Sequence, residues 1–280
     1  MSEMPQNLTG LSYRSMTFGN KITAAADLTK QHGLTIFLTM LAGWFVLFAI
    51  LIVGLMIFGG AMAVGGNQGF SGFQIGAILG IFLFYIIFFF LAQFFMVGVD
   101  SLLLKFVDHR EVDGGVVNQV LSPWRNFVPV LLCIVVWFVL YFLANIILAI
   151  FNLIPFLGIL INLAGSIVLA MVMSCVQFYI ADSADLSVRD VVVTPVNVVA
   201  NNFLTWLAAM GTAIAVYLPG ILALFVIMYI VSGSTALMIL AGLAGLVYFV
   251  AASIYIFVFF AITYRQTHGG GMETVVDRVF

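Results

Sequence analysis

Long runs of apolar residues, separated by short polar segments, dominate the pattern along the chain. Six of these runs exceed the roughly 20 residues that a helix needs to cross a bilayer, and none contains Asp, Glu, Lys, Arg or His. A transmembrane barrel would instead show segments of about 10 residues with alternating polarity. The pattern therefore predicts an all-α, polytopic membrane protein, with spans at about 34–58, 75–99, 127–151, 156–180, 203–231 and 236–264.

The connections between the spans predict three hairpins. Residues 59–72 contain six glycines and no charge, which is typical of a flexible external loop. Asn152–Pro155 and Ser232–Ser234 are short enough for tight turns. The chain is therefore expected to have an N-terminal segment at 1–33, a six-helix transmembrane domain at 34–264 and a C-terminal tail at 265–280.

A similar polar stretch precedes each hairpin. The three stretches read ITAAADLTKQHG, VVNQVLSPWRN and VVVTPVNVVANN, and each combines a weakly charged, moderately apolar segment with a polar break. Before the third, Ser187 and Asp190 have the spacing of a helix-capping box. We expect an internal repeat of a short amphipathic helix at the membrane interface followed by a hairpin. The alternative interpretation is that these stretches are ordinary polar loops.

Charged residues are few, and their placement predicts an orientation. The 280 residues include 9 Lys and Arg and 11 Asp and Glu, a charged fraction of 7%, against about 25% in soluble domains. This composition excludes a soluble domain, a disordered chain, a nucleic-acid-binding surface and a disulfide-stapled secreted domain. All nine basic residues lie in the two terminal segments and in the second and fourth connections. The positive-inside rule therefore predicts that both termini are cytoplasmic.

Several residues within the spans are candidates for helix packing. Gly76 and Gly80 form a GxxxG pair, and Ala241 and Gly245 form a second pair of small residues at the same spacing. Asn145 and Asn162 are symmetric about the turn between the third and fourth spans, so their amides are expected to lie at one depth and to hydrogen-bond across the helices. Pro219 is expected to kink the fifth span.

One region resembles a known family. The stretch FYIADSADLSVRDVVVTPVNVVANNFLTWL at 178–207, the run from Leu218 to Ile221 and the plan of a short helix plus a hairpin are similar to uncharacterised bacterial YciC-like inner-membrane proteins. That group is in turn similar to the membrane domain of some glycerophosphoryl diester phosphodiesterases. The resemblance implies a bacterial inner-membrane location and assigns no catalytic residue to the membrane part.

Candidates for catalytic or metal-binding chemistry are sparse. The run Asp108–Asp113 offers oxygen and nitrogen ligands, but its spacing matches no metal motif, and a solvated, charge-balanced loop is the favoured interpretation. Cys133 and Cys175 are expected to be apolar fillers at one depth. An enzyme needs titratable groups around a pocket, and a proton-driven or sodium-driven transporter buries an ionisable residue. We therefore expect no catalytic residue, no metal, no cofactor and no buried carboxylate.

The favoured function is that of a scaffold or accessory subunit of a membrane complex, in contact with lipids and with a membrane-protein partner or a second copy of the chain. Replacing Gly80 with Leu would then disrupt the assembly. The alternative is an uncoupled channel or a carrier for a lipid or a small apolar or neutral solute. That alternative requires a water-accessible path lined by Asn145, Asn162 or Gln177.

Overall fold

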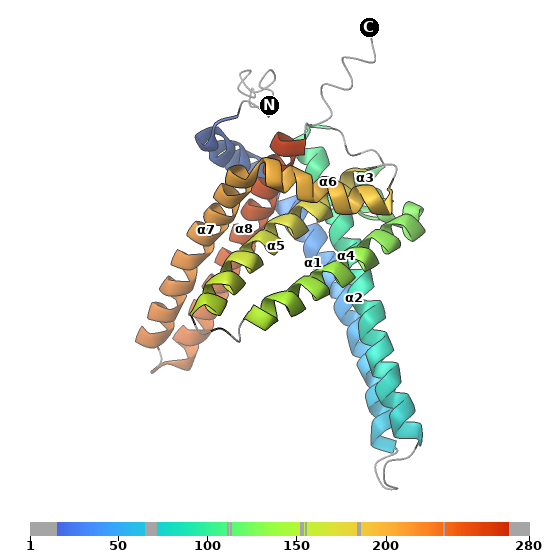
Figure 1. Cartoon of the computed structure of the whole chain (residues 1–280). Coiled ribbons are helices and arrows are strands. Elements are labelled where there is room, and N and C mark those ends of the chain that lie inside the picture. Colours follow the sequence, from blue (N-terminus) through green and yellow to red (C-terminus); the bar gives the residue numbers. More distant parts are fainter. Residues whose placement is uncertain are drawn as a thin grey trace.

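The computed structural model of the chain is helical throughout the part that it describes (Figure 1). It describes residues 16–64, 72–110, 112, 114–151, 154, 156–183, 186–231 and 233–268. Six of its helices are long and apolar enough to cross a membrane. They are α1 (Phe18–Val64), α2 (Gly72–Val107), α4 (Phe127–Phe151), α5 (Leu157–Asp182), α7 (Phe203–Ile230) and α8 (Thr235–His268). The predicted all-α, polytopic membrane protein is confirmed.

Consecutive long helices pair as hairpins, and glycines on one helix accept large side chains from the other. On α1, a Cβ at Gly43 would overlap the ring of Phe95, and a Cβ at Gly54 would overlap the ring of Phe84. On α7, Gly220 accepts the ring of Tyr248 in the same way. Because the missing side chain lets the two backbones approach closely, these glycines stabilise the hairpins by van der Waals packing.

The first predicted interfacial helix is not a separate element. We expected a break at Gly33, but α1 continues without interruption from Phe18 to Val64, over 47 residues. A single glycine costs only about 1 kcal/mol relative to alanine inside a helix. Ala25, Leu28 and Ile36, on both sides of Gly33, are buried in the core, so packing keeps the helix continuous.

The other two segments that were predicted to be interfacial are separate helices. Between α2 and α4 lie a short helix, α3 (Gly115–Val120), and a 3-10 turn, η3 (Ser122–Asn126), which has Pro123 in its first turn. Between α5 and α7 lies α6 (Val188–Asn201), whose N-cap Ser187 accepts a hydrogen bond from the backbone N–H of Asp190, as predicted.

A proline determines how α6 is attached to α4. Pro195 has no N–H, so the carbonyl of Val191, one turn earlier, has no partner within α6. The indole Nε1 of Trp137 on α4 donates to that carbonyl over 2.8 Å in a buried contact. The bond fixes α6 against α4 and satisfies an acceptor that the helix itself cannot satisfy.

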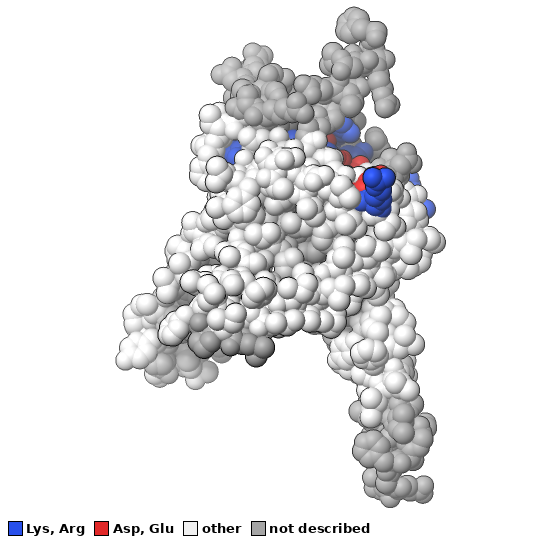
Figure 2. Space-filling view, viewed as in Figure 1, with Lys and Arg blue, Asp and Glu red and all other residues white. Residues whose placement is uncertain are grey.

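The two ends of the bundle differ in packing and in charge. We call the end where α2, α5 and α8 finish the charged end, and the end where the hairpins turn the hairpin end. The buried residues of α8 all lie between Ala252 and Arg265, at the charged end. Figure 1 shows the α1–α2 and α7–α8 hairpins diverging away from that end. On the face in Figure 2, the charged side chains gather at the charged end as well.

Candidate functional site

Three charged side chains meet where α2, α5 and α8 end. The guanidinium group of Arg265 donates from Nε to Asp108 Oδ1 over 2.8 Å and from Nη2 to Asp108 Oδ2 over 2.7 Å. Its Nη1 donates to Asp182 Oδ2 over 2.6 Å. Since each hairpin contributes its second helix to this cluster, the Arg265 junction (Asp108, Asp182 and Arg265) joins all three hairpins.

The Arg265 junction is shielded from solvent and has further polar neighbours. The Arg265 side chain is only 6% exposed, and the hydroxyl of Tyr264 donates to Asp182 Oδ2 over 3.2 Å. Arg110 approaches Asp108 to 3.7 Å. Burial raises the pKa of the Asp108 carboxyl group, and the positive charge of Arg265 opposes that shift. Bidentate contacts between guanidinium and carboxylate are among the strongest hydrogen bonds in proteins, so the junction is a rigid clamp.

The junction corrects two expectations from the sequence. Asp108 was expected in a solvated loop, but it binds Arg265, and Arg265 was expected in a polar tail, but it lies inside α8 and is buried. The sequence contained one indication of this cluster, which is the position of its members. Asp108, Asp182 and Arg265 each follow the second apolar run of a predicted hairpin. Their charge signs are complementary, but local periodicity does not show that helix ends 157 positions apart lie side by side.

Asp100 also contradicts the expectation of no buried carboxylate. The second span was expected to end at residue 99, but α2 continues to Val107 and carries Asp100 into the core, where it is 2% exposed. Its Oδ2 atom has no hydrogen-bond partner among the described residues. On the neighbouring face of α2, Ser101 accepts a hydrogen bond from Gln119 of α3 over 2.6 Å.

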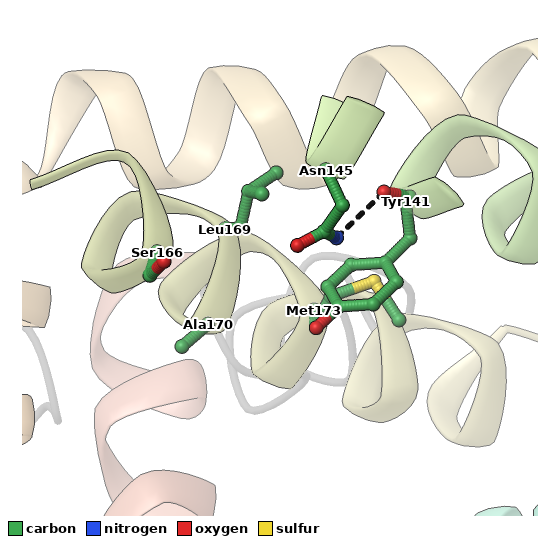
Figure 3. A pocket seen from close by; sticks show the side chains of 6 residues that line it. All are labelled: Tyr141, Asn145, Ser166, Leu169, Ala170 and Met173. Atoms are coloured by element: carbon green, nitrogen blue, oxygen red, sulfur yellow. Dashed lines mark hydrogen bonds between the residues drawn. The ribbon is translucent and has the colours of Figure 1, made fainter. Parts of the chain in front are cut away.

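The predicted asparagine pair makes hydrogen bonds within its own helices. Asn145 donates to the carbonyl of Tyr141 over 2.8 Å, and Asn162 accepts from the hydroxyl of Ser166 over 3.3 Å. A hollow of about 230 Å³ lies between α4 and α5 (Figure 3). It is lined by Tyr141, Asn145, Ser166, Leu169, Ala170 and Met173. The hollow combines three polar side chains with three apolar ones, and neither Asn162 nor Gln177 lines it.

The small-residue pairs lie in different surroundings. A Cβ at Gly245 would come within 2.9 Å of Leu224, so this glycine faces α7, and Ala241 precedes it by one turn. Gly80 is half-buried and lies one turn before Phe84, whose ring packs at Gly54 of α1. Residues four apart share a helix face, so Gly80 is on the face of α2 that contacts α1. The side-chain surroundings of Gly76 lie outside the described residues.

Pro219 lies within a continuous α7 rather than between two helices. The next residue, Gly220, accepts the ring of Tyr248, and the Tyr248 hydroxyl donates to the carbonyl of Val216. One turn closer to the charged end, the hydroxyl groups of Tyr217 and Ser253 lie 2.8 Å apart. This part of α7 is therefore occupied by contacts with α8.

The remaining candidates for chemistry are the two cysteines. Cys133 and Cys175 are free and buried. Among the residues that the structure describes, no group of three or more His, Cys, Asp or Glu could hold a metal ion. The polar chemistry of the described chain is thus concentrated in the Arg265 junction and Asp100 at the charged end, and in the hollow beside Asn145.

In comparisons with known proteins, no family model, curated protein or solved structure matches the chain.

Proposed function

We propose that the protein is a non-catalytic scaffold or accessory subunit that binds other membrane proteins through its hairpins. The observation that carries this proposal is an apolar stripe on α2, formed by Leu79, Phe82, Leu83 and Ile86. These residues follow the i, i+3, i+4, i+7 spacing of a single helix face, and all four are exposed, with Phe82 at 64%. The helices that the structure describes leave this face exposed.

The stripe differs from the face of α2 that packs within the hairpin. The rings of Phe84 and Phe95 fill spaces at Gly54 and Gly43 of α1, so the hairpin is already closed on that side. A second membrane helix can therefore pack on the stripe without separating α1 from α2. Helix association in lipid depends on such van der Waals contacts.

The proposed orientation rests on the distribution of charge, and the proposed location rests on the resemblance to a known family. We assign the charged end to the cytoplasm, because the basic residues lie in the terminal segments and in the connections at that end. The proposed location is a bacterial inner membrane, on the basis of the resemblance to YciC-like proteins. Under this assignment α3, η3 and α6 lie at the cytoplasmic interface.

Native purification tests the proposal directly. Full-length protein extracted from its own membrane in nanodiscs should co-purify with another membrane protein at fixed stoichiometry. Phe82→Ala should reduce this co-purification because it removes the largest side chain of the stripe, without changing the thermal stability of the protein. The matched control is Leu204→Ala, which removes an exposed apolar side chain (77% exposed) from the charged end of α7.

Retention of the partner at wild-type level by Phe82→Ala would show that the stripe is not the binding surface. A monomer or a closed homo-oligomer, with no second protein, would contradict the accessory-subunit proposal itself.

A second candidate function is an uncoupled channel or a carrier for a lipid or a small neutral solute. The observation that favours it is the hollow beside Asn145, where Tyr141 and Ser166 add hydroxyl groups between two membrane helices. Polar groups at membrane depth often mark a pathway. Flux through liposomes that contain only the purified chain, reduced by Asn145→Leu, would favour this function over the scaffold.

A further inference from the structure

Asp100 places a carboxyl group in the packed core of the charged end, where its Oδ2 atom has no hydrogen-bond partner among the described residues. The side chain is 2% exposed, and Oδ2 is buried without a hydrogen bond in the described structure. Its neighbours on α2 are apolar and buried, with Val99 at 1% and Leu102 and Leu103 at 0% exposure. An ionised carboxylate in such surroundings is strongly unfavourable unless a cation compensates it.

Asp108, two turns further along the chain and just beyond the last residue of α2, shows how compensation occurs in this protein. Its two oxygens accept two hydrogen bonds from Arg265, which neutralises the charge. Asp100 takes part in no ion pair of this kind among the described residues. The two carboxyl groups therefore have opposite electrostatic surroundings, although one lies within α2 and the other directly follows its last residue.

The cationic side chains on the helices that pack against α2 are engaged elsewhere or exposed. Arg265 binds Asp108 and Asp182, and Lys30 pairs with Asp27 at 3.9 Å. Three further side chains on these helices pack on aromatic rings: Lys21 on Phe259, His32 on Phe106 and His268 on Tyr264. The fourth, Arg125, is exposed. The thiols of Cys133 and Cys175 are the titratable groups buried on α4 and α5, and α3 carries none.

A metal cation lacks ligands at this position. Sodium, calcium and magnesium need several oxygen ligands, whereas the neighbouring Ser101 hydroxyl already accepts a hydrogen bond from Gln119. The described residues contain no cluster of three metal-ligating side chains. A proton, in contrast, needs only one carboxyl oxygen to bind.

We propose that Asp100 is a proton-binding site, whose carboxyl group holds a proton while the ends of α2, α5 and α8 are packed and releases it when they separate. On release, the O–H bond breaks, the electron pair stays on the carboxylate, and the proton passes to water at the charged end. The site goes beyond a scaffolding function, because it makes the packing of the three hairpins respond to pH.

Infrared spectroscopy of the purified full-length protein tests the proposal. At neutral pH the folded protein should show the stretching band of a protonated carboxyl group, and this band should disappear when the protein is unfolded at the same pH. The band should also be absent from Asp100→Asn. A folded wild-type protein without a protonated carboxyl band at neutral pH would overturn the proposal, even if no variant folds.

The pH dependence of thermal unfolding gives a second, independent measurement. A group that keeps its proton when folded and releases it when unfolded makes the protein less stable as pH rises. The melting temperature of the wild type should therefore fall from mildly acidic to mildly alkaline pH, and Asp100→Asn should abolish most of that fall. The matched control, Asp108→Asn, should lower the melting temperature but keep the fall. An unchanged pH profile in Asp100→Asn would refute the assignment.

Discussion

At the charged end, α5 and α8 pack in a common core, whereas at the hairpin end the same helices expose most of their apolar side chains. Met171, Cys175 and Ile262 are fully buried, while Leu163 and Leu246 are 61% and 60% exposed. Large apolar side chains are present at both ends, so apolar side chains alone do not explain the difference. What distinguishes the charged end is a set of specific contacts. The Arg265 junction connects the three hairpins, and the Trp137 bond and the approach of α3 to α2 attach the short helices α6 and α3 to them.

The comparison shows how helices associate when the solvent is itself apolar. An apolar side chain gains little by leaving lipid for the protein interior, so apolar surface alone does not draw hairpins together. Polar contacts and close backbone approach do so, and in this chain those that connect different hairpins are concentrated at the charged end. The hairpin end keeps its exposed apolar faces for lipid or for other membrane helices.

Breaking the Arg265 junction should cause the largest loss of stability, because this junction holds the three hairpins together at the charged end. Arg265→Leu leaves Asp108 and Asp182 without their shared cation, and loss of one partner from a buried ion pair typically costs about 3–5 kcal/mol. We expect a value near the lower limit, because the Asp182 side chain is 28% exposed. Chemical unfolding in detergent measures the loss. The control is Lys30→Leu, which removes a cation whose side chain is 79% exposed, and an equal loss in both variants would show that the junction is no clamp.

A side chain at Gly98 should separate α3 from α2. A Cβ at this position would overlap the carbonyl oxygen of Val120, which cannot rotate away as a flexible side chain could. Gly98→Ala should therefore destabilise the protein by about 1–3 kcal/mol, as overpacking does, and raise hydrogen exchange in residues 115–126. The control Gly211→Ala has open space around its Cβ and should be neutral or stabilising. Unchanged exchange in 115–126 would contradict this account.

Loss of a single hydrogen bond should have the smallest effect on stability. It should still have different consequences at the charged end and within the α7–α8 hairpin. Trp137→Phe leaves the carbonyl of Val191 without a partner in a buried site, at a cost of about 1 kcal/mol. Tyr217→Phe removes a bond to Ser253 within the α7–α8 hairpin, where such bonds contribute about 0.6 kcal/mol on average. Only the first change should raise proteolysis around α6. Equal proteolysis in both variants would mean that Trp137 does not fix α6.

Several elements of the fold were predictable because their causes are local. Ser187 caps α6 because its hydroxyl reaches the N–H of Asp190, three residues along the chain. The span at 127–151 coincides with α4, because the apolar run begins after Arg125 and Asn126 and ends before Asn152. The continuity of α1 through Gly33 was not predictable, because a small local penalty was outweighed by packing.

The candidate site was less predictable than the fold. The predicted spans ended where each apolar run ended, which placed Asp100, Asp108 and Arg265 outside the spans. Their burial depends on the cores of other helices, and this information is absent from the local pattern. The resemblance to YciC-like proteins, the membrane partner and the cytoplasmic orientation stay predictions.

The sequence by itself determined that the chain is an all-α membrane protein with six spans, and where its charges lie along the chain, because apolar run length and charge position are local properties. Only the tertiary structure decided which apolar faces pack, that Arg265 binds two carboxylates from different hairpins, and that Asp100 is buried with its Oδ2 atom unpaired among the described residues. The physical reason is that helices apolar on all sides have no preferred face. Their partners are selected by a few polar contacts and close approaches between distant segments.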